Sequence, residues 1–180
     1  MPKYYTGRGD DGTTGTLAGT RLKKSDKLME AIGSLDELNS AVGVALSYVD
    51  DKLIADQLKS IQNDLFVIGA ELASADGKKE VESKLKPDAS ARLEASIKEL
   101  GDLMPGLDKF VLPGGSRAAA HLHMARSIAR RTERMIVAAA GNYRIGNMVI
   151  AYLNRLSSYL FVAALYINFK DRVEELHPTY

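Results

Sequence analysis

The chain has 180 residues, of which 46% are hydrophobic and 26% charged, and its formal net charge is +1. This is the length and composition of one globular domain, residues 1–180, with enough apolar side chains for a core of its own. A charge near zero excludes an overall field that draws the chain to nucleic acid or to an anionic membrane, and the absence of cysteine excludes disulfides and thiolate metal sites.

The N-terminus lacks the apolar core of a signal peptide, and no stretch is predicted to be long and uncharged enough to span a bilayer. We therefore expect a cytoplasmic protein without a membrane partner. Any basic binding site must be local, because the surface as a whole is not basic.

Residues 1–25 precede the first helical pattern and are rich in glycine and threonine from residue 6 onward. They contain G-x-G-x-x-G at Gly7, Gly9 and Gly12. A Rossmann site is rejected, because no strand signal precedes these glycines and no helix opens from them. The segment is either a flexible tail or an ordered loop whose backbone N–H groups wrap a phosphate chain. The side chains that would assist such a loop are Thr6, Arg8, Thr13, Thr14 and Lys24.

The first helix is predicted from Ser34-Leu35-Asp36-Glu37, which has the form of a capping box. Its apolar positions are Leu35, Leu38, Val42, Leu46 and Val49. A second helix is indicated by apolar residues at alternating steps of four and three, the seam typical of helix bundles. That seam consists of Ile54, Leu58, Ile61, Leu65, Ile68 and Leu72.

A polar stretch at 75–87 predicts a loop, after which Asp88 is placed to cap a third helix that ends before Pro105. The apolar run 110–112 then leads into Pro113-Gly114-Gly115-Ser116, which breaks the chain and starts a fourth helix. The seam of this fourth helix consists of Leu122, Ala125, Ala129, Thr132, Ile136 and Ala139.

Gly141 is expected in the left-handed conformation that often follows a helix end. A fifth helix is predicted to run to about Phe169. Its seam consists of Val149, Leu153, Leu156, Leu160, Ala163 and Ile167. Strand signals are nearly absent, so the predicted fold class is all-α: a five-helix up-and-down bundle over 26–171, followed by a loose tail at 172–180.

The fourth helix carries a stripe of arginines. Arg126, Arg130 and Arg134 are spaced at i, i+4 and i+8, and Glu133 shares their face. Arg131 points away and is expected to be solvated. The stripe is either a solvated basic face neutralised by Glu133 or a site for a phosphate or carboxylate, which arginine forks fit well.

Other polar residues leave alternatives open. Asn154 and Arg155 interrupt an apolar run and serve either as contacts between helices or as ligand contacts. Asp36, read as a first-turn carboxylate, either favours the helix dipole or pairs with a distant arginine. His121 and His123 lie two apart and are interpreted as structural. No Ser-His-Asp set or pair of catalytic carboxylates is apparent.

Five stretches, in this order, resemble the PduO-type ATP:cob(I)alamin adenosyltransferases. They are Gly9-Asp10-x-Gly12-Thr13-Thr14, Glu30-Ala31-x-Gly33-Ser34-x-Asp36-Glu37-Leu38-Asn39-Ser40, Phe110-Val111-Leu112-Pro113-Gly114-Gly115-Ser116, Ala125-Arg126-x-x-x-Arg130-Arg131-x-Glu133-Arg134 and Tyr152-Leu153-Asn154-Arg155-Leu156-Ser157. Together they span nearly the whole chain. Arg8, Asp11 and Ser158 depart from the family pattern, which leaves the phosphate contacts and the setting of Arg155 open.

The resemblance implies a ferritin-like five-helix bundle that forms a homotrimer with active sites between subunits. It also implies that cob(I)alamin cobalt is joined to the 5′-carbon of ATP, that triphosphate leaves and that Mg²⁺ assists, without naming the residues that hold the metal. The ATP-binding residues that it implies are Thr6, Gly7, Arg8, Gly9, Asp10, Gly12, Thr13, Thr14, Lys24, Arg130, Glu133, Arg134 and Asn154.

The resemblance further implies that Asp36 and Arg126 pair across the subunit interface and that Phe110 occupies the lower face of cobalt. From sequence alone, Phe110 is interpreted as a core anchor of its loop. A flavin-type or other reductase is a possible partner. Two other functions fit the sequence: a different nucleotide-dependent transferase or phosphate-sensing bundle, and a non-enzymatic helical interaction protein. ATP binding separates the last from the others.

Overall fold

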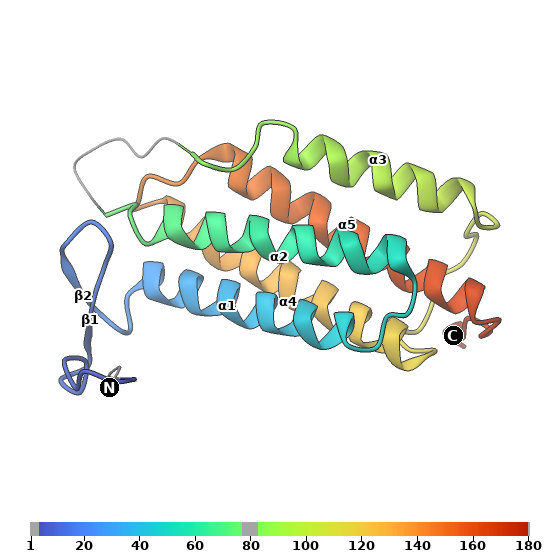
Figure 1. The fold of residues 1–180 in the computed structure, drawn as a ribbon, viewed down its shortest axis with the longest axis horizontal. Coiled ribbons are helices and arrows are strands. Elements are labelled where there is room, and N and C mark those ends of the chain that lie inside the picture. Colours follow the sequence, from blue (N-terminus) through green and yellow to red (C-terminus); the bar gives the residue numbers. More distant parts are fainter. Residues whose placement is uncertain (1–3, 77–82, 180) are drawn as a thin grey trace.

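The computed structural model describes residues 4–76 and 83–179 and contains five long helices. They are α1 (Lys27–Leu46), α2 (Lys52–Leu72), α3 (Ala89–Asp102), α4 (Arg117–Ala140) and α5 (Asn147–Lys170). Each helix runs opposite to the one before it along the long axis of the molecule (Figure 1). The predicted all-α, five-helix up-and-down bundle is confirmed.

All five helices contribute buried side chains to the core. Helix α1 packs against both α2 and α4, α4 packs against α5, and α3 covers the outside of α5. The predicted seams of α2, α4 and α5 are buried. At the centre, the hydroxyls of Ser34 and Thr132 lie 2.7 Å apart, and Thr132 Oγ1 lies 3.0 Å from the Ser34 carbonyl oxygen. This buried polar contact fixes the relative positions of α1 and α4.

Helix α1 begins two turns earlier than the sequence predicted. Asp26 caps it, since its side chain accepts a 2.8 Å hydrogen bond from Leu28 N. Ser34 is not a cap, because its hydroxyl is buried in mid-helix against α4. Asp36 therefore lies in the middle of α1, and its interpretation as a first-turn carboxylate is wrong.

The N-terminal segment forms a small hairpin that the sequence analysis missed. Strands β1 (Thr13–Gly15) and β2 (Arg21–Lys23) pair antiparallel, with Thr14 opposite Leu22. The flexible-tail interpretation is therefore wrong. Strands of three residues are too short to show the alternation by which a strand is recognised in a sequence.

Other helix ends agree in part with the sequence. Ser116 caps α4 by accepting from Ala119 N at 3.3 Å, as predicted. Asp88 stands at the start of α3 but makes no capping hydrogen bond through its side chain. Gly141 is right-handed, with φ of −66°, so its predicted left-handed conformation is wrong. Residues 77–82 of the predicted loop lie outside the described residues.

The tail predicted to be loose is held in place by hydrogen bonds. Leu112 N donates to Leu176 O at 2.7 Å, and His177 Nδ1 lies 2.8 Å from Phe110 O. Residues 172–179 therefore fold back onto the connection between α3 and α4. Tyr180, the last residue of the predicted tail, lies outside the described residues.

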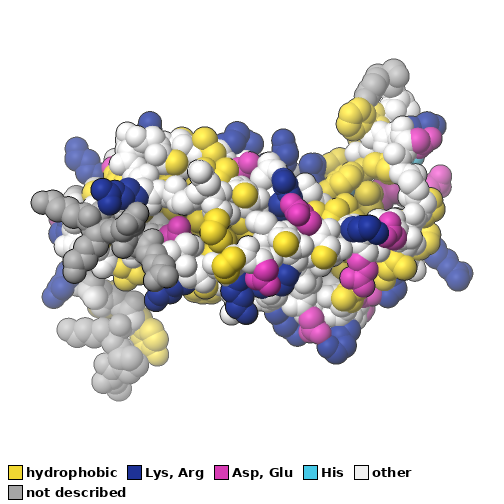
Figure 2. Space-filling view, turned by 90° about the horizontal axis from the view of Figure 1, so that it is seen from above, with side chains coloured by type: hydrophobic (Ala, Val, Ile, Leu, Met, Phe, Trp, Pro, Cys, Tyr) yellow, Lys and Arg dark blue, Asp and Glu magenta, His cyan; other side chains and the backbone are white. Residues whose placement is uncertain are grey.

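Helix α5 is, contrary to our expectation, long and apolar enough to meet the criteria for a membrane span. However, 56% of its most apolar window is buried inside the bundle, and core helices often pass the same test. Figure 2 shows basic and acidic side chains interspersed over the face seen from above, with apolar side chains between them. This mixed surface agrees with the net charge near zero.

Candidate functional site

Helices α4 and α5 enclose an open depression of about 430 Å³. Its lining consists of Arg130, Glu133, Arg134, Val137, Ala138 and Asn154. Asn154 Nδ2 donates to Glu133 Oε1 at 3.1 Å and so ties the two helices together across its floor. The helical spacing predicted that Arg130, Glu133 and Arg134 share one face of the fourth helix, and the structure adds Asn154 of α5 to this group.

The two arginines of the depression are available to a ligand. Arg134 donates to the carbonyl oxygen of Arg130 at 3.1 Å, and neither arginine has an ion-pair partner among the residues that the structure describes. Two guanidinium groups beside one carboxylate leave a local excess of positive charge, which suits a polyanion.

Neighbouring arginines are, in contrast, paired. Arg131 forms an ion pair with Glu37 of α1, and both side chains stay accessible to solvent, as expected for Arg131. Arg155 donates to Glu94 of α3 at 2.6 Å and to Asn154 Oδ1 at 2.8 Å. Asn154 and Arg155 are both exposed in this single chain, although they interrupt an apolar run. Arg155 links α3 to α5, and Asn154 faces the depression.

Arg126 lies one turn before Arg130 in a more buried setting. Its guanidinium carbon is 5.5 Å from the centre of the Phe161 ring, a cation–π contact. Burial, followed by repulsion from Arg130, lowers the pKa of Arg126, and its buried Nε has no hydrogen-bond partner among the described residues. A buried donor of this kind calls for an acceptor from outside the chain.

His123 packs beside Arg126, and its ring lies 5.9 Å from that of Phe161. It is 2% exposed, and neither ring nitrogen has a hydrogen-bond partner in the described part of the chain. Burial, together with the charge of Arg126, lowers the pKa of His123. His121 instead stacks on Tyr48, with ring centres 4.8 Å apart. Both histidines are therefore packing residues, as the sequence predicted.

Asp36 is exposed on α1 and makes no ion pair with any described residue. Within one chain it does not meet Arg126. The expected pair between these residues thus requires a second copy of the chain.

The glycine-rich segment before β1 is a series of tight turns. Gly7 and Gly12 have φ of +68° and +78°, which favour glycine over any other residue. Asp11 Oδ1 accepts from the backbone N and the hydroxyl of Thr13, at 2.9 and 2.7 Å, and these bonds lower the pKa of Asp11. Asp11 therefore occupies two of the donors that were expected to be free for phosphate.

Lys24 does lie against the glycine turns, as its expected role requires. A Cβ on Gly9 would stand 3.2 Å from Lys24 Nζ, so the ammonium group packs directly over this glycine. Arg21, which the sequence analysis missed, donates to the carbonyl oxygen of Arg8 at 2.7 Å and also bonds Thr13. Arg21 could have been found only from its pairing with Gly15 in the hairpin, and the hairpin itself was not predicted.

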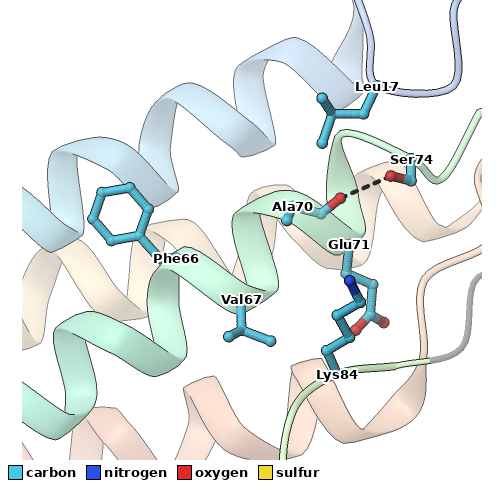
Figure 3. A pocket seen from close by; sticks show the side chains of 7 residues that line it. All are labelled: Leu17, Phe66, Val67, Ala70, Glu71, Ser74 and Lys84. Carbon is cyan, nitrogen blue, oxygen red and sulfur yellow. Dashed lines mark hydrogen bonds between the residues drawn. The ribbon is translucent and has the colours of Figure 1, made fainter.

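The hairpin is fastened to the C-terminal end of α2. Leu17 N donates to Ala73 O at 2.8 Å, and the hydroxyls of Thr16 and Thr20 both donate to Asp76 Oδ2. Beneath the tip lies a mostly apolar pocket of about 360 Å³ (Figure 3). Its lining consists of Leu17, Phe66, Val67, Ala70, Glu71, Ser74 and Lys84. None of these belongs to the predicted ATP or corrinoid site.

Phe110 lies on the connection between α3 and α4 and is 79% exposed. Its interpretation as a core anchor is therefore wrong. The connection lies at one end of the bundle, whereas the hairpin lies at the other end (Figure 1). No hairpin residue lines the depression between α4 and α5. One chain thus presents three separate parts of the predicted site and does not bring them together.

The part of the chain that the structure describes contains no group of three or more His, Asp or Glu side chains that could hold a metal ion. The depression offers one carboxylate, that of Glu133. A cation held here would need further oxygen ligands from a bound molecule.

Solved structures of other proteins share this fold closely. One is a variant of the PduO-type ATP:corrinoid adenosyltransferase from Lactobacillus reuteri complexed with cobalamin and ATP. It superposes with a TM-score of 0.94 at 35% sequence identity, and the alignment covers 99% of this chain and 100% of that one. A second variant of that enzyme, complexed with ATP, gives a TM-score of 0.91 at 36% identity over 98% of this chain and all of that chain.

Sequence comparison points the same way. The corrinoid adenosyltransferase of Bacillus subtilis is 39% identical over 97% of this chain and 91% of its own length. The human corrinoid adenosyltransferase MMAB is 36% identical over 97% of this chain and 72% of its own length. The family model for cobalamin adenosyltransferase matches residues 4–167. This chain therefore belongs to the cobalamin adenosyltransferase family.

Proposed function

We propose that the protein transfers the 5′-deoxyadenosyl group of ATP to the cobalt of cob(I)alamin, forming adenosylcobalamin and releasing triphosphate. The observation that carries this proposal is the arginine-rich depression, in a chain that aligns over nearly its full length with an enzyme solved with cobalamin and ATP. Arg130 and Arg134 have no ion-pair partner in the described chain, which leaves their forks free for phosphate oxygens.

The chemistry asks little of the side chains as acids or bases. The cobalt supplies the electron pair that forms the new bond to the 5′-carbon, and the bond from that carbon to the triphosphate oxygen breaks with its electron pair on oxygen. The negative charge that develops on triphosphate is what the protein has to stabilise. Arg130, Arg134 and Lys24 are the cations assigned to it, and the turns around Gly9 supply backbone N–H groups.

We assign the complete site to two copies of the chain. Helix α1 has 20 residues, so the hairpin before it and the far end of the bundle are about 30 Å apart. Within one subunit, the hairpin does not line the depression that carries the arginines. A neighbouring subunit that contributes its hairpin to the depression solves this, and we propose a homotrimer as the assembly.

Arg126 and Asp36 form, in this proposal, the ion pair between the subunits. In the described part of the chain, the buried Nε of Arg126 has no hydrogen-bond partner and Asp36 is exposed, so each has the free group that the other needs. Phe110 then lies beside the lower face of the corrin. A phenyl ring has no lone pair to give to cobalt, so it excludes water and the nucleotide base and favours the reduced, four-coordinate metal.

Mg²⁺ fits this site as a cation carried by the ATP phosphates. Such ions are usually held by one or two carboxylates together with substrate phosphates and water. Glu133 is the carboxylate of the depression, and its bond from Asn154 keeps one oxygen aimed along the floor. We further propose a cytoplasmic location, since a reducing compartment suits cob(I)alamin, and a flavin-type or other reductase that supplies the electron.

The test is incubation of the protein with ATP, Mg²⁺ and chemically reduced cobalamin, followed by the absorption spectrum of the corrinoid. We expect the spectrum of adenosylcobalamin and one triphosphate per product. Omitting ATP, or replacing it with a non-cleavable analogue, is the control. ATP binding without turnover would favour a phosphate-sensing bundle, and the absence of ATP binding would favour a helical interaction protein.

A further inference from the structure

The connection between α3 and α4 carries Phe110, but the ring of this residue does not anchor it. The side chain of Phe110 is 79% exposed, but its carbonyl oxygen accepts from the imidazole of His177, with Nδ1 at 2.8 Å. Two residues on, Leu112 N donates to Leu176 O at 2.7 Å. The backbone is therefore fastened at Phe110 itself and two residues after it, whereas the aromatic ring is exposed.

Both bonds come from the C-terminal segment, and a turn at the end of α5 directs that segment back. Val173 N donates to Asn168 O at 2.9 Å, and Arg172 N donates to Phe169 O at 3.2 Å, the two bonds of a Schellman motif. Arg172 adopts φ of 55°, in the left-handed region that glycine usually occupies at this position. We call residues 172–177 the C-terminal strap.

Asn168 joins the strap to the start of α4. It is fully buried, and its amide makes three hydrogen bonds. Oδ1 accepts from Ser116 N at 3.0 Å, while Nδ2 donates to Gly114 O at 3.2 Å and to Glu175 Oε1 at 3.0 Å. The amide group of Asn168 thus forms hydrogen bonds with the loop before α4 and with the strap at the same time.

The loop lies so close to Asn168 that it tolerates no side chain there. Gly115 has φ of +98°, and a Cβ built on it would stand 2.2 Å from the Asn168 amide atoms. The contact is therefore made by backbone directly against Asn168, a close approach that only glycine allows.

We propose that Asn168 and His177 are positioning residues for the adenosyl transfer, because with the strap they fix the backbone from which the Phe110 ring projects. This inference rests on the proposed function, in which Phe110 faces the corrin. An exposed ring keeps one position beside a substrate only if its backbone is held from elsewhere, and these hydrogen bonds are what hold it. Asn168 is fully buried, and the role assigned to both residues is to hold the backbone.

The first test measures the loop without turnover. Hydrogen exchange of the Leu112 amide is compared in the full-length wild type, His177→Ala and Asn168→Asp, with the latter keeping the size of the side chain but losing both donated bonds. We expect exchange to be about tenfold faster in each variant, the effect of losing roughly one net hydrogen bond. His121→Ala and Asn63→Asp are matched controls that do not touch the loop, and their Leu112 exchange should equal that of the wild type.

The second test divides the kinetic effect between the substrates. We expect kcat/KM for the corrinoid to fall about tenfold in both variants, since the ring is no longer held in one place, while KM for ATP is unchanged. Two conservative variants should restore part of the lost kcat/KM for the corrinoid. Asn168→Gln keeps the donor and acceptor on a longer side chain in a buried position, so it should restore less. His177→Asn should restore more, because its amide still reaches the carbonyl oxygen of Phe110 from an exposed position.

Unchanged Leu112 exchange in both variants would overturn the inference, because the strap would then not fasten the loop. Faster exchange with normal corrinoid kinetics would overturn it too, because the position of the loop would not matter. If Asn168→Asp fails to fold, His177→Ala decides alone, since its side chain is exposed. A wild-type chain that makes no adenosylcobalamin would refute the proposed function, while the exchange data would still judge the strap.

Discussion

The hairpin and the Phe110 loop lie at opposite ends of the bundle (Figure 1). Each is fastened to the C-terminal end of a helix by a polar side chain. Asp76, just after α2, accepts from Thr16 and Thr20 of the hairpin. Asn168, in the last turn of α5, bonds Gly114 and Ser116 of the other loop.

The two regions differ in how much they support themselves. The hairpin has its own strand pairs and a local hydrogen-bond network around Asp11. Asp76 therefore only attaches an already formed hairpin to the end of α2. The Phe110 loop has no regular secondary structure and takes its backbone bonds from a segment more than 50 residues away in the sequence. A loop of the second kind is more sensitive to distant substitutions than one of the first kind.

The largest effect is expected where the two ends are joined in the proposed trimer. Asp36→Ala or Arg126→Ala strands a charge at the subunit interface, and each should cost roughly 3 to 5 kcal/mol if the assembled pair is deeply buried. A double-mutant cycle on activity and on trimer stability measures the coupling. Additive effects would show that the residues never meet, and a monomer with full activity in sedimentation equilibrium would refute the shared site.

A slightly smaller effect is expected in the depression between the two regions. Arg130→Ala and Arg134→Ala should each cost on the order of 2 to 4 kcal/mol in the transition state, because each removes a charge-assisted contact to triphosphate. Steady-state kinetics with ATP as the varied substrate measure this. Arg131→Ala, which breaks only the exposed pair with Glu37, is the control and should stay near the wild-type rate. Wild-type turnover by both depression variants would mean that the stripe is a solvated face.

These two predictions rest on the part of the site that the sequence made easiest to find. Spacing of four along a long helix places arginines on one face whatever the tertiary structure, so the grouping of Arg130, Glu133 and Arg134 was predictable. The seams were predictable for the same reason. Ser34 was misassigned because a local pattern cannot show that its hydroxyl bonds Thr132, 98 residues away.

The hairpin and the strap were not predictable in this way. The strands of the hairpin are too short for periodicity, and its attachment depends on Asp76, which shows no local signal of this role. The strap had one signal: Asn168 is a polar residue on the buried side of an apolar helix and so required partners. Finding those partners needed the fold.

A paired substitution sharpens the contrast between the ends. Asp76→Ala should raise KM for ATP about tenfold and leave the corrinoid kinetics unchanged, because it unseats only the hairpin. Phe110→Ala should do the reverse: ATP binding is kept, but most of the four-coordinate cob(II)alamin signal in magnetic circular dichroism is lost. Its activity should fall most when cob(II)alamin is reduced on the enzyme. If either variant impairs both substrates equally, the division of labour between the ends is wrong.

The smallest effect is expected at Arg172. Replacing it with glycine removes the cost of a left-handed residue at the helix end, so the variant should be more stable by about 0.5 to 1 kcal/mol. Chemical denaturation gives the free energy of unfolding. A less stable variant would show that the Arg172 side chain stabilises the fold by more than its left-handed backbone costs. Arg172→Ala separates these two contributions, because it removes the side chain beyond Cβ and keeps the backbone cost.

The placement of the hairpin and Phe110 at opposite ends of one chain has a genetic consequence. If each site takes the hairpin from one subunit and Phe110 from the next, two inactive alleles need not give an inactive cell. A chain that lacks Lys24 and a chain that lacks Phe110 would, when expressed together, assemble some trimers with one site in which both contributions are intact. Alleles damaged at the same end would never rescue one another.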